Sequence, residues 1–120
     1  MNILITNNPL VCEEYDKKAN TKYIETDLIG VLTHVRDYIH RGHKLLTHPL
    51  SGSVKPNETL YKSVIISEKF DATDMQSVKI IEECITAVQK FPQREISDKH
   101  LKDLQIVDLS LIKAVIQRID

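Results

Sequence analysis

The sequence predicts an α/β fold, in which a small, mainly parallel four-stranded sheet is covered by helices on both faces. Short runs of β-favouring apolar residues alternate along the chain with longer stretches of helical spacing, which is typical of parallel sheets. Two of these runs, at residues 2–6 and 64–66, are apolar on consecutive residues and indicate strands buried on both faces. The chain has 120 residues with no internal repeat or linker, so a single domain over residues 1–120 is expected.

Four strands are expected, at residues 2–6, 21–26, 43–48 and 61–67. Right-handed crossovers place consecutive strands next to one another, so the preferred strand order is 2-1-3-4. Residues 50–60 show neither a helical nor a strand period. The link to the fourth strand is therefore expected to lack a helix, and the direction of that strand stays open.

The first two helices have boundaries that the sequence marks. Asn8 is a good N-cap and Pro9 suits the first helical position, so a short helix is expected from residue 9 to about residue 18. Asp27 precedes a second helix, and Gly42 stands where a helix commonly ends. The apolar residues of the second helix recur at helical spacing and form one stripe, which consists of Leu28, Val31, Leu32, Val35 and Ile39.

The last third of the chain is expected to be helical. Thr73 and Gln76 form a capping box for a helix that stops before Pro92. Ser97 is expected to cap a shorter helix, and Asp108 to cap a final one. The residues of the final helix that are expected to face inward are Leu109, Ile112, Ile116 and Ile119.

The final helix carries more apolar side chains than one face needs, because Leu111 and Val115 add to that stripe. Two interpretations follow. The helix either contributes to a homodimer through the C-terminal helices, or it packs on two sides within one monomer.

Composition excludes several functional classes. Lysine and arginine number 16 against 17 acidic residues, for a net charge of −1, whereas nucleic-acid binders usually carry a basic excess. No apolar run approaches the length that crosses a bilayer, and the N-terminus has no secretory-signal pattern. Cys12 and Cys84 are far apart in sequence, which is typical of reduced thiols in a cytoplasmic protein. We expect neither nucleic acid nor membrane as a partner.

A ligand site is expected where the strand order reverses. In the order 2-1-3-4 this point lies between the first and third strands, at their carboxyl ends. Asn7 and Asn8 follow the first strand, and His48 ends the third. The helix after Pro9 would direct free amide groups at the same crevice, which favours an anion.

The loop at residues 48–59 is the most unusual stretch of the chain. It combines a flexible glycine, two hydroxyls, a mobile cation and turn-forming residues, which together can hold a small anion. A long connection without its own period is often functional, although a plain surface connection would use similar residues. The residues of this loop that are expected to bind the ligand are Ser51, Gly52, Ser53, Lys55 and Asn57.

Catalytic and metal signals are weak. His48 is a candidate general acid or base beside the loop, and the alternative is a histidine hydrogen-bonded to the loop backbone. The spacings among the five histidines match no common metal-ligand set, so no metal is expected. The P-loop and dinucleotide glycine patterns are absent, and no cofactor is identified. An enzyme is therefore not the first interpretation.

Three segments resemble the GrdX family, which comprises small proteins encoded beside glycine, sarcosine and betaine reductase genes of amino-acid-fermenting anaerobic bacteria. They are residues 4–11, the loop segment at 42–59 and the strand at 61–66, and the resemblance extends over essentially the whole chain. The family has no established activity, so the resemblance implies no catalytic residue. It implies an accessory, maturation or regulatory role for the reductase system.

Two functions are weighed on these grounds. The first is an accessory protein that binds a small anion, or a protein of the reductase system, through the 48–59 loop together with Asn7 and Asn8. The alternative is a small enzyme that acts on a phosphorylated or carboxylated metabolite with His48, Lys55 and a serine.

Overall fold

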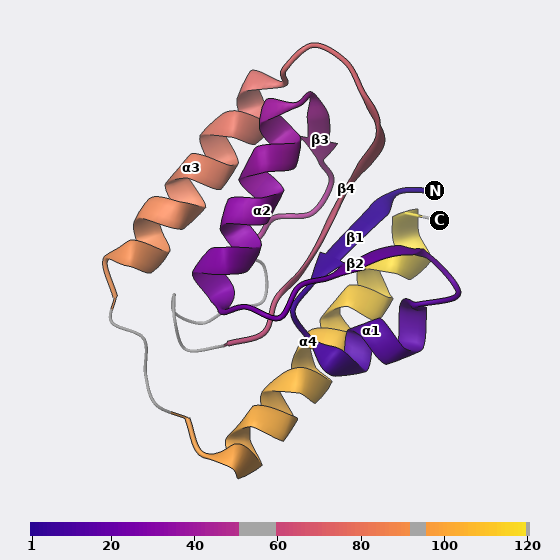
Figure 1. Cartoon of the computed structure of the whole chain (residues 1–120), viewed down its shortest axis with the longest axis vertical. Helices are drawn as coiled ribbons and strands as arrows, with labels where there is room; N and C mark the ends of the chain where they lie inside the picture. The colour runs from indigo at the N-terminus through magenta and orange to yellow at the C-terminus, as the bar shows by residue number, and fades with distance from the viewer. Residues whose placement is uncertain (51–59, 92–95, 120) are drawn as a thin grey trace.

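The computed structural model describes residues 1–50, 60–91 and 96–119. Within these ranges four strands form one sheet, and two helices lie on each of its faces (Figure 1). The α/β class, the helices on both faces and the helical C-terminus are thus confirmed. In chain order the elements are β1 (Ile3–Thr6), α1 (Pro9–Tyr15), β2 (Asn20–Tyr23), α2 (Leu28–His40), β3 (His43–Leu45), β4 (Ser63–Phe70), α3 (Met75–Gln89) and α4 (Asp98–Ile119).

The sheet is mixed, and its strand order is β2-β1-β4-β3. β1 pairs with β2 in parallel, whereas β4 runs antiparallel to both β1 and β3. The predictions of a mainly parallel sheet and of the order 2-1-3-4 are therefore wrong. The physical reason is burial: Val64 and Ile66 face one side of β4 and Ile65 faces the other, and all three are buried. A strand that is apolar on both faces is favoured at the centre of a sheet that helices cover on both sides.

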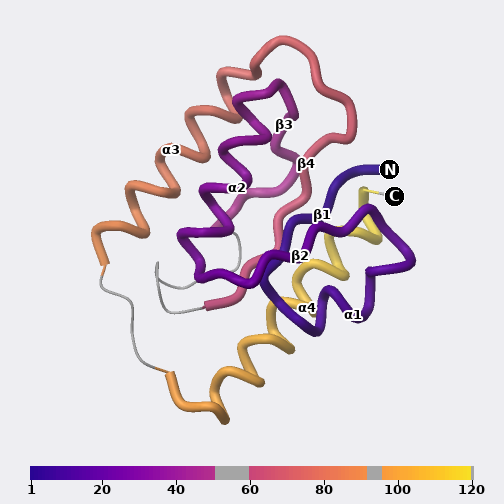
Figure 2. The backbone as a smooth tube through the Cα atoms, viewed as in Figure 1, coloured from indigo at the N-terminus to yellow at the C-terminus, as the bar shows by residue number. Residues whose placement is uncertain are grey.

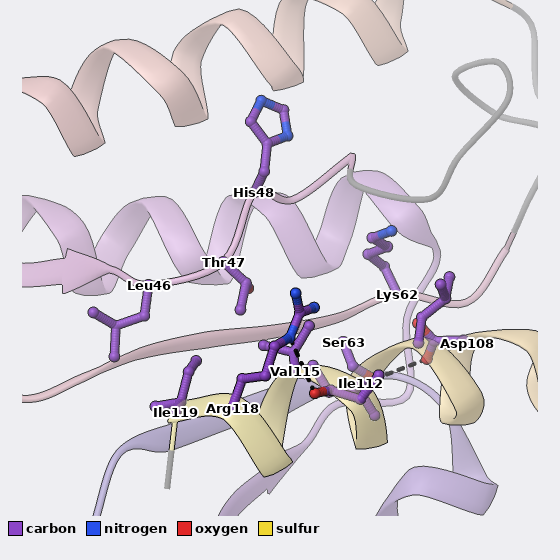
Figure 3. Close-up of a pocket in the computed structure, with 12 residues that line it drawn as sticks. Leu46, Thr47, His48, Lys62, Ser63, Asp108, Ile112, Val115, Arg118 and Ile119 are labelled. Atoms are coloured by element: carbon purple, nitrogen blue, oxygen red, sulfur yellow. Dashed lines mark hydrogen bonds between the residues drawn. The ribbon is translucent and has the colours of Figure 1, made fainter.

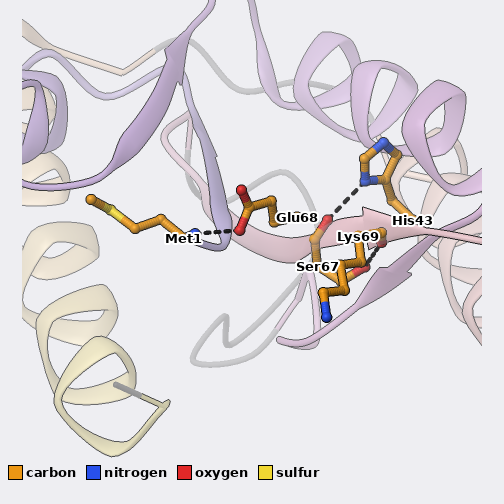
Figure 4. A network of polar contacts seen from close by, with 5 residues as sticks. All are labelled: Met1, His43, Ser67, Glu68 and Lys69. Carbon is orange, nitrogen blue, oxygen red and sulfur yellow. Dashed lines mark hydrogen bonds and ion pairs between the residues drawn. The ribbon is translucent and has the colours of Figure 1, made fainter.

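β3 is instead a short edge strand, and the chain after it continues along β4. Leu45 lies opposite Ile66, the amide of Leu46 donates to the Ile65 carbonyl at 2.9 Å, and the Ile65 amide donates to Thr47 Oγ1 at 3.0 Å. At the other end, His43 Nδ1 donates to the Ser67 carbonyl at 2.8 Å (Figure 4).

The far half of β4 extends beyond its pairing with β1. Glu68 there forms an ion pair with the N-terminal ammonium of Met1, and Ser67 Oγ donates to the Lys69 carbonyl at 2.8 Å (Figure 4). Both carboxylate and ammonium are exposed, so the pair contributes little to stability.

Alternation of side chains along the strands divides the core into two layers. Ile3, Ile5, Val64 and Ile66 face α2 and α3, which lie side by side on one face of the sheet (Figure 2). On the other face α1 and α4 cover a smaller cluster. The buried residues of that cluster are Leu4, Val11, Tyr15, Ile65 and Ile112.

The starts of α1 and α2 follow the predicted caps. Asn8 Oδ1 accepts from the Leu10 amide at 3.0 Å, and Asp27 Oδ1 accepts from the Gly30 amide at 2.9 Å. For α3 the N-cap is Asp74, one residue later than predicted. After α2, Gly42 adopts a φ of +107°, a conformation that favours glycine.

The C-terminal region forms one helix of 22 residues, not the two that were predicted. Asp108 lies in the middle of α4 and is 5% exposed. Its carboxylate accepts hydrogen bonds from the side chains of Asn8 and Ser63, so Asp108 is not the N-cap of a helix. Leu109, Val115 and Ile116 pack against the cluster that α1 and α4 cover, whereas Leu111 is 40% exposed. A homodimer through the C-terminal helices stays a prediction.

The first half of α4 extends beyond the sheet (Figure 1). Ile106 and Val107 in this region are each 53% exposed. Across the described part of the chain, no helix combines the length and apolarity that spanning a bilayer requires.

Candidate functional site

A cavity of about 430 Å³ lies between the second half of α4, the start of β4 and the chain segment that follows β3 (Figure 3). This volume falls in the range of small-molecule sites. Its polar lining residues are Thr47, His48, Lys62, Ser63, Asp108 and Arg118. Its apolar wall is formed mainly by Leu46, Leu111, Ile112, Val115 and Ile119.

Ser63 and Asp108 form the polar floor of the cavity, and they belong to a directed chain of hydrogen bonds that continues to the buried Thr6 and Asn8. Ser63 Oγ donates to Asp108 Oδ2 at 2.8 Å, so in its 2.8 Å contact with Thr6 Oγ1 the serine accepts and Thr6 donates. Thr6 Oγ1 in turn accepts from the backbone amide of Asn8 at 3.0 Å. The Asn8 side-chain amide also donates to Asp108 Oδ2, at 3.0 Å. Every donated proton in this chain points toward Asp108.

Lys62 provides a buried ammonium beside this floor. Its residue is 5% exposed, and its backbone amide donates to Asn7 Oδ1 at 2.9 Å. Burial lowers the pKa of Lys62, because the charged ammonium loses water, and the nearby Asp108 carboxylate opposes part of that effect. The Asp108 carboxylate therefore favours the charged ammonium of Lys62, against the effect of burial.

Arg118 is placed differently. It is exposed, lies in the last turn of α4 and extends from the helix toward the segment that carries Thr47 (Figure 3). Its Nε donates to the Ala114 carbonyl at 3.4 Å, which holds the side chain along the helix. Among the residues that the structure describes, its guanidinium forms no ion pair. Arg118 is therefore the uncompensated cation of the cavity.

His48 stands at the rim of the cavity. Its Nδ1 accepts from the Leu50 amide at 3.2 Å, so in the neutral ring the proton is on Nε2. A hydrogen bond from His48 to the loop backbone is the alternative to a catalytic role that the sequence analysis gave. In Figure 3 the imidazole points away from Ser63 and Asp108. The role of His48 as an acid or base stays a prediction.

Asn7 and Asn8 lie at the predicted edge of the sheet, but β4 occupies the place where the crevice between the first and third strands was expected. Asn7 Nδ2 donates to the carbonyls of Leu60, at 2.6 Å, and Thr26, at 2.9 Å. Asn8 Nδ2 donates to the Gln105 carbonyl as well as to Asp108. The side-chain amides of Asn7 and Asn8 thus form hydrogen bonds that connect separate segments of the fold.

The predicted loop residues cannot be placed beside these amides. Ser51, Gly52, Ser53, Lys55 and Asn57 lie outside the described residues. The ligand-binding role of the loop, and of Asn7 and Asn8 with it, stays a prediction.

The described residues form neither a metal-binding group nor a reactive thiol. No group of three histidine, cysteine or acidic side chains in those ranges is placed to hold a metal ion. Cys12 and Cys84 are free thiols, and burial raises the pKa of each, that of Cys84 to about 11. Both therefore stay protonated near neutral pH, which disfavours nucleophilic roles.

Sequence reasoning missed five polar residues of the cavity, Thr47, Lys62, Ser63, Asp108 and Arg118. One signal was present: Asp108 precedes Ile112 by four residues and so occupies the apolar stripe of α4. A carboxylate within such a stripe indicates a buried polar partner. The other four carry no pattern that distinguishes them from surface residues.

Comparison with known proteins identifies the family. A family model described as GrdX-like protein matches residues 3–117, which include Lys62, Ser63 and Asp108. No curated protein and no solved structure matches the chain. The match covers nearly all of the sequence and agrees with the resemblance in the three segments noted above. The chain therefore belongs to the GrdX-like protein family.

Proposed function

We propose that this chain is an accessory or regulatory protein of a glycine, sarcosine or betaine reductase system, and that it binds a small anion through the 48–59 loop, on the side where His48 borders the cavity. Membership of the GrdX-like family supports the association with the reductase. The uncompensated guanidinium of Arg118, in a cavity that also borders His48, is the observation that carries anion binding. A protein of the reductase system is the alternative occupant of this side.

The arrangement of the polar residues supports binding over catalysis. A nucleophilic serine needs a base that takes its proton, with a third group that orients the base. Ser63 instead donates its proton to the Asp108 carboxylate, and the imidazole of His48 points away from both. The hydroxyl is thus committed to a structural contact.

Calorimetry with the full chain tests the proposal. Phosphate, acetyl phosphate, glycine and a nucleoside monophosphate are titrated, and the purified reductase components are tested for association in parallel. We expect one of these ligands to bind through its phosphate or carboxylate group, and the His48→Ala and Lys55→Ala variants to bind it more weakly. Lys17→Ala, a change at an exposed position after α1, is the matched control. Absence of both anion binding and association with any reductase component would reject the proposal.

A second candidate is a small enzyme that acts on a phosphorylated or carboxylated metabolite. One observation favours it: Lys62 has a lowered pKa and lines the cavity together with a buried carboxylate, a combination that is common at active sites. Turnover of acetyl phosphate and of small carboxylic acids, followed by NMR, tests this candidate. Loss of turnover in Lys62→Gln or His48→Ala would support it, and unchanged rates in both would exclude these residues from chemistry.

A further inference from the structure

We infer that the cavity beside α4 binds an organic monocarboxylate that has an apolar body, with its carboxylate between Arg118 and Thr47. This inference rests on the proposed anion binding and names its ligand class. An inorganic anion such as phosphate would fit the charge of the guanidinium but not the rest of the cavity.

Charge balance indicates a ligand with a single negative charge. Lys62 and Asp108 both line the cavity and carry opposite charges, so as a pair they add no net charge to it. Arg118 remains, with no ion pair among the described residues. A guanidinium presents a planar set of donors that matches a carboxylate with two parallel hydrogen bonds.

Thr47 supplies a second donor at the same place. Its hydroxyl oxygen accepts from the Ile65 amide at 3.0 Å, and none of the described contacts uses the hydroxyl proton. Figure 3 shows Arg118 extending from α4 toward Thr47 across the cavity. A carboxylate between Arg118 and Thr47 would accept hydrogen bonds from both side chains.

The apolar wall accounts for the rest of the ligand. Leu46, Leu111 and Ile119 line the cavity and remain 37%, 40% and 38% exposed, so a large part of each faces water. Removing such surface from water is favourable in proportion to its area. A carboxylate with an alkyl or aryl body covers these side chains, whereas acetate and phosphate leave them exposed.

The floor explains why the charged group of the ligand is not held there. The hydroxyls of Thr6 and Ser63 and the amide of Asn8 all donate within the chain that ends at Asp108. No proton of this chain is left for a ligand. The anion therefore binds at the Arg118 end, and its apolar body extends along Ile112 and Val115.

Binding is measured by calorimetry on the full chain with hexanoate, acetate, inorganic phosphate and hexylamine. We expect hexanoate to bind at least about tenfold more tightly than acetate or phosphate, and hexylamine not to bind. Arg118→Gln should weaken hexanoate binding by about ten- to a hundredfold, because a charge-assisted hydrogen bond is lost. Thr47→Val should weaken it less.

The matched control is Lys113→Gln, which removes another cation of α4. Lys113 forms an ion pair with Glu14 on α1 and does not line the cavity. This variant should leave hexanoate affinity unchanged. Arg118 is exposed, so circular dichroism is expected to show a folded Arg118→Gln variant. An NMR titration adds an independent readout, since shifts at the Ile112 and Val115 methyl groups report an occupied cavity.

The outcomes separate this inference from the function on which it rests. Equal affinity for phosphate and hexanoate, both lost in Arg118→Gln, would overturn the apolar body while anion binding stands. If hexylamine bound as tightly as hexanoate, the negative charge of the ligand would not determine binding, and the role given to Arg118 would be wrong. Absence of hexanoate binding in a protein that captures a reductase component would overturn the ligand class and leave the accessory role in place.

Discussion

Ser63, the first residue of β4, donates its hydroxyl proton to the carboxylate of Asp108 in the middle of α4, at 2.8 Å. The same carboxylate oxygen accepts from the side chain of Asn8 at 3.0 Å, so one acidic group joins α4 to β4 and to the N-terminus of α1. Both donors and the acceptor are buried. The position of α4 over the sheet, and with it one wall of the cavity, depends on this junction.

Replacement of Asp108 tests the junction. Asp108→Ala leaves two buried donors without an acceptor, and we expect the free energy of unfolding to fall by about 3 kcal/mol. Asp108→Asn keeps one acceptor oxygen and should lose less. Urea unfolding measures both, with Asp103→Ala on the exposed side of α4 as the control, which should stay within about 0.5 kcal/mol of the original protein. A loss for Asp108→Ala no larger than that of the control would contradict the assigned role.

Local signals in the sequence predicted much of the fold. Asn8 and Asp27 cap the helices that they were expected to cap, because a side-chain oxygen before an apolar helical stripe satisfies the first free amides. The consecutive apolar residues at 64–66 correctly indicated a strand buried on both faces. These features depend on neighbours in sequence, which a pattern can report.

Strand order and the cavity depend on residues far apart in the chain, and there the predictions failed or missed the site. The rule that consecutive strands lie side by side placed β3 next to β1, yet β4 has the larger apolar surface and occupies the central position. Asp108 resembled an N-cap because its partners, Ser63 and Asn8, are 45 and 100 residues away. Candidate residues at 51–57 lie outside the described residues, so their role stays a prediction.

Gly42 is expected to tolerate no side chain. Its φ is +107°, and a Cβ at this position would lie 1.9 Å from the backbone carbonyl oxygen of Asp71. We predict that Gly42→Ala lowers the free energy of unfolding by at least about 2 kcal/mol, from backbone strain and the displacement of residue 71. Thermal unfolding compares it with Arg41→Ala, the exposed neighbour in ordinary helical conformation. Similar melting temperatures for the two variants would disprove the steric argument.

Ser77 connects the start of α3 to the edge strand. Its hydroxyl donates to Asp74 Oδ2 at 2.5 Å and accepts from the Leu45 amide at 3.0 Å, and the residue is 2% exposed. Ser77→Ala leaves the Leu45 amide without this acceptor, so we expect a loss of about 1–3 kcal/mol in urea unfolding.

Hydrogen exchange gives the sharper readout for Ser77, since the Leu45 amide should exchange faster in Ser77→Ala than in the original protein. Thr86→Ala is the matched control, because Thr86 bonds the Glu82 carbonyl on the exposed side of the same helix. If the Leu45 amide keeps its protection in Ser77→Ala, the hydroxyl is not what holds β3 at this edge.

The thiol of Cys84 is expected to make stability fall at alkaline pH. Burial, with a smaller contribution from the charge of Glu83, raises its pKa from 9.0 to about 11. Between these values the unfolded chain has lost the thiol proton while the folded protein keeps it. The folded state then binds more protons, so the stabilising effect is complete below pH 9 and is lost as the pH rises toward about 11.

Cys84→Ala removes this titration at the cost of a small cavity in the core. We therefore expect the variant to be less stable than the original protein at pH 8, and the difference between them to narrow at pH 10. Urea unfolding under reducing conditions at both pH values measures it, with Cys12→Ala at a half-buried position as the comparison. A difference that is the same at pH 8 and pH 10 would mean that Cys84 ionises alike in the folded and unfolded chains, and that its burial does not control its proton.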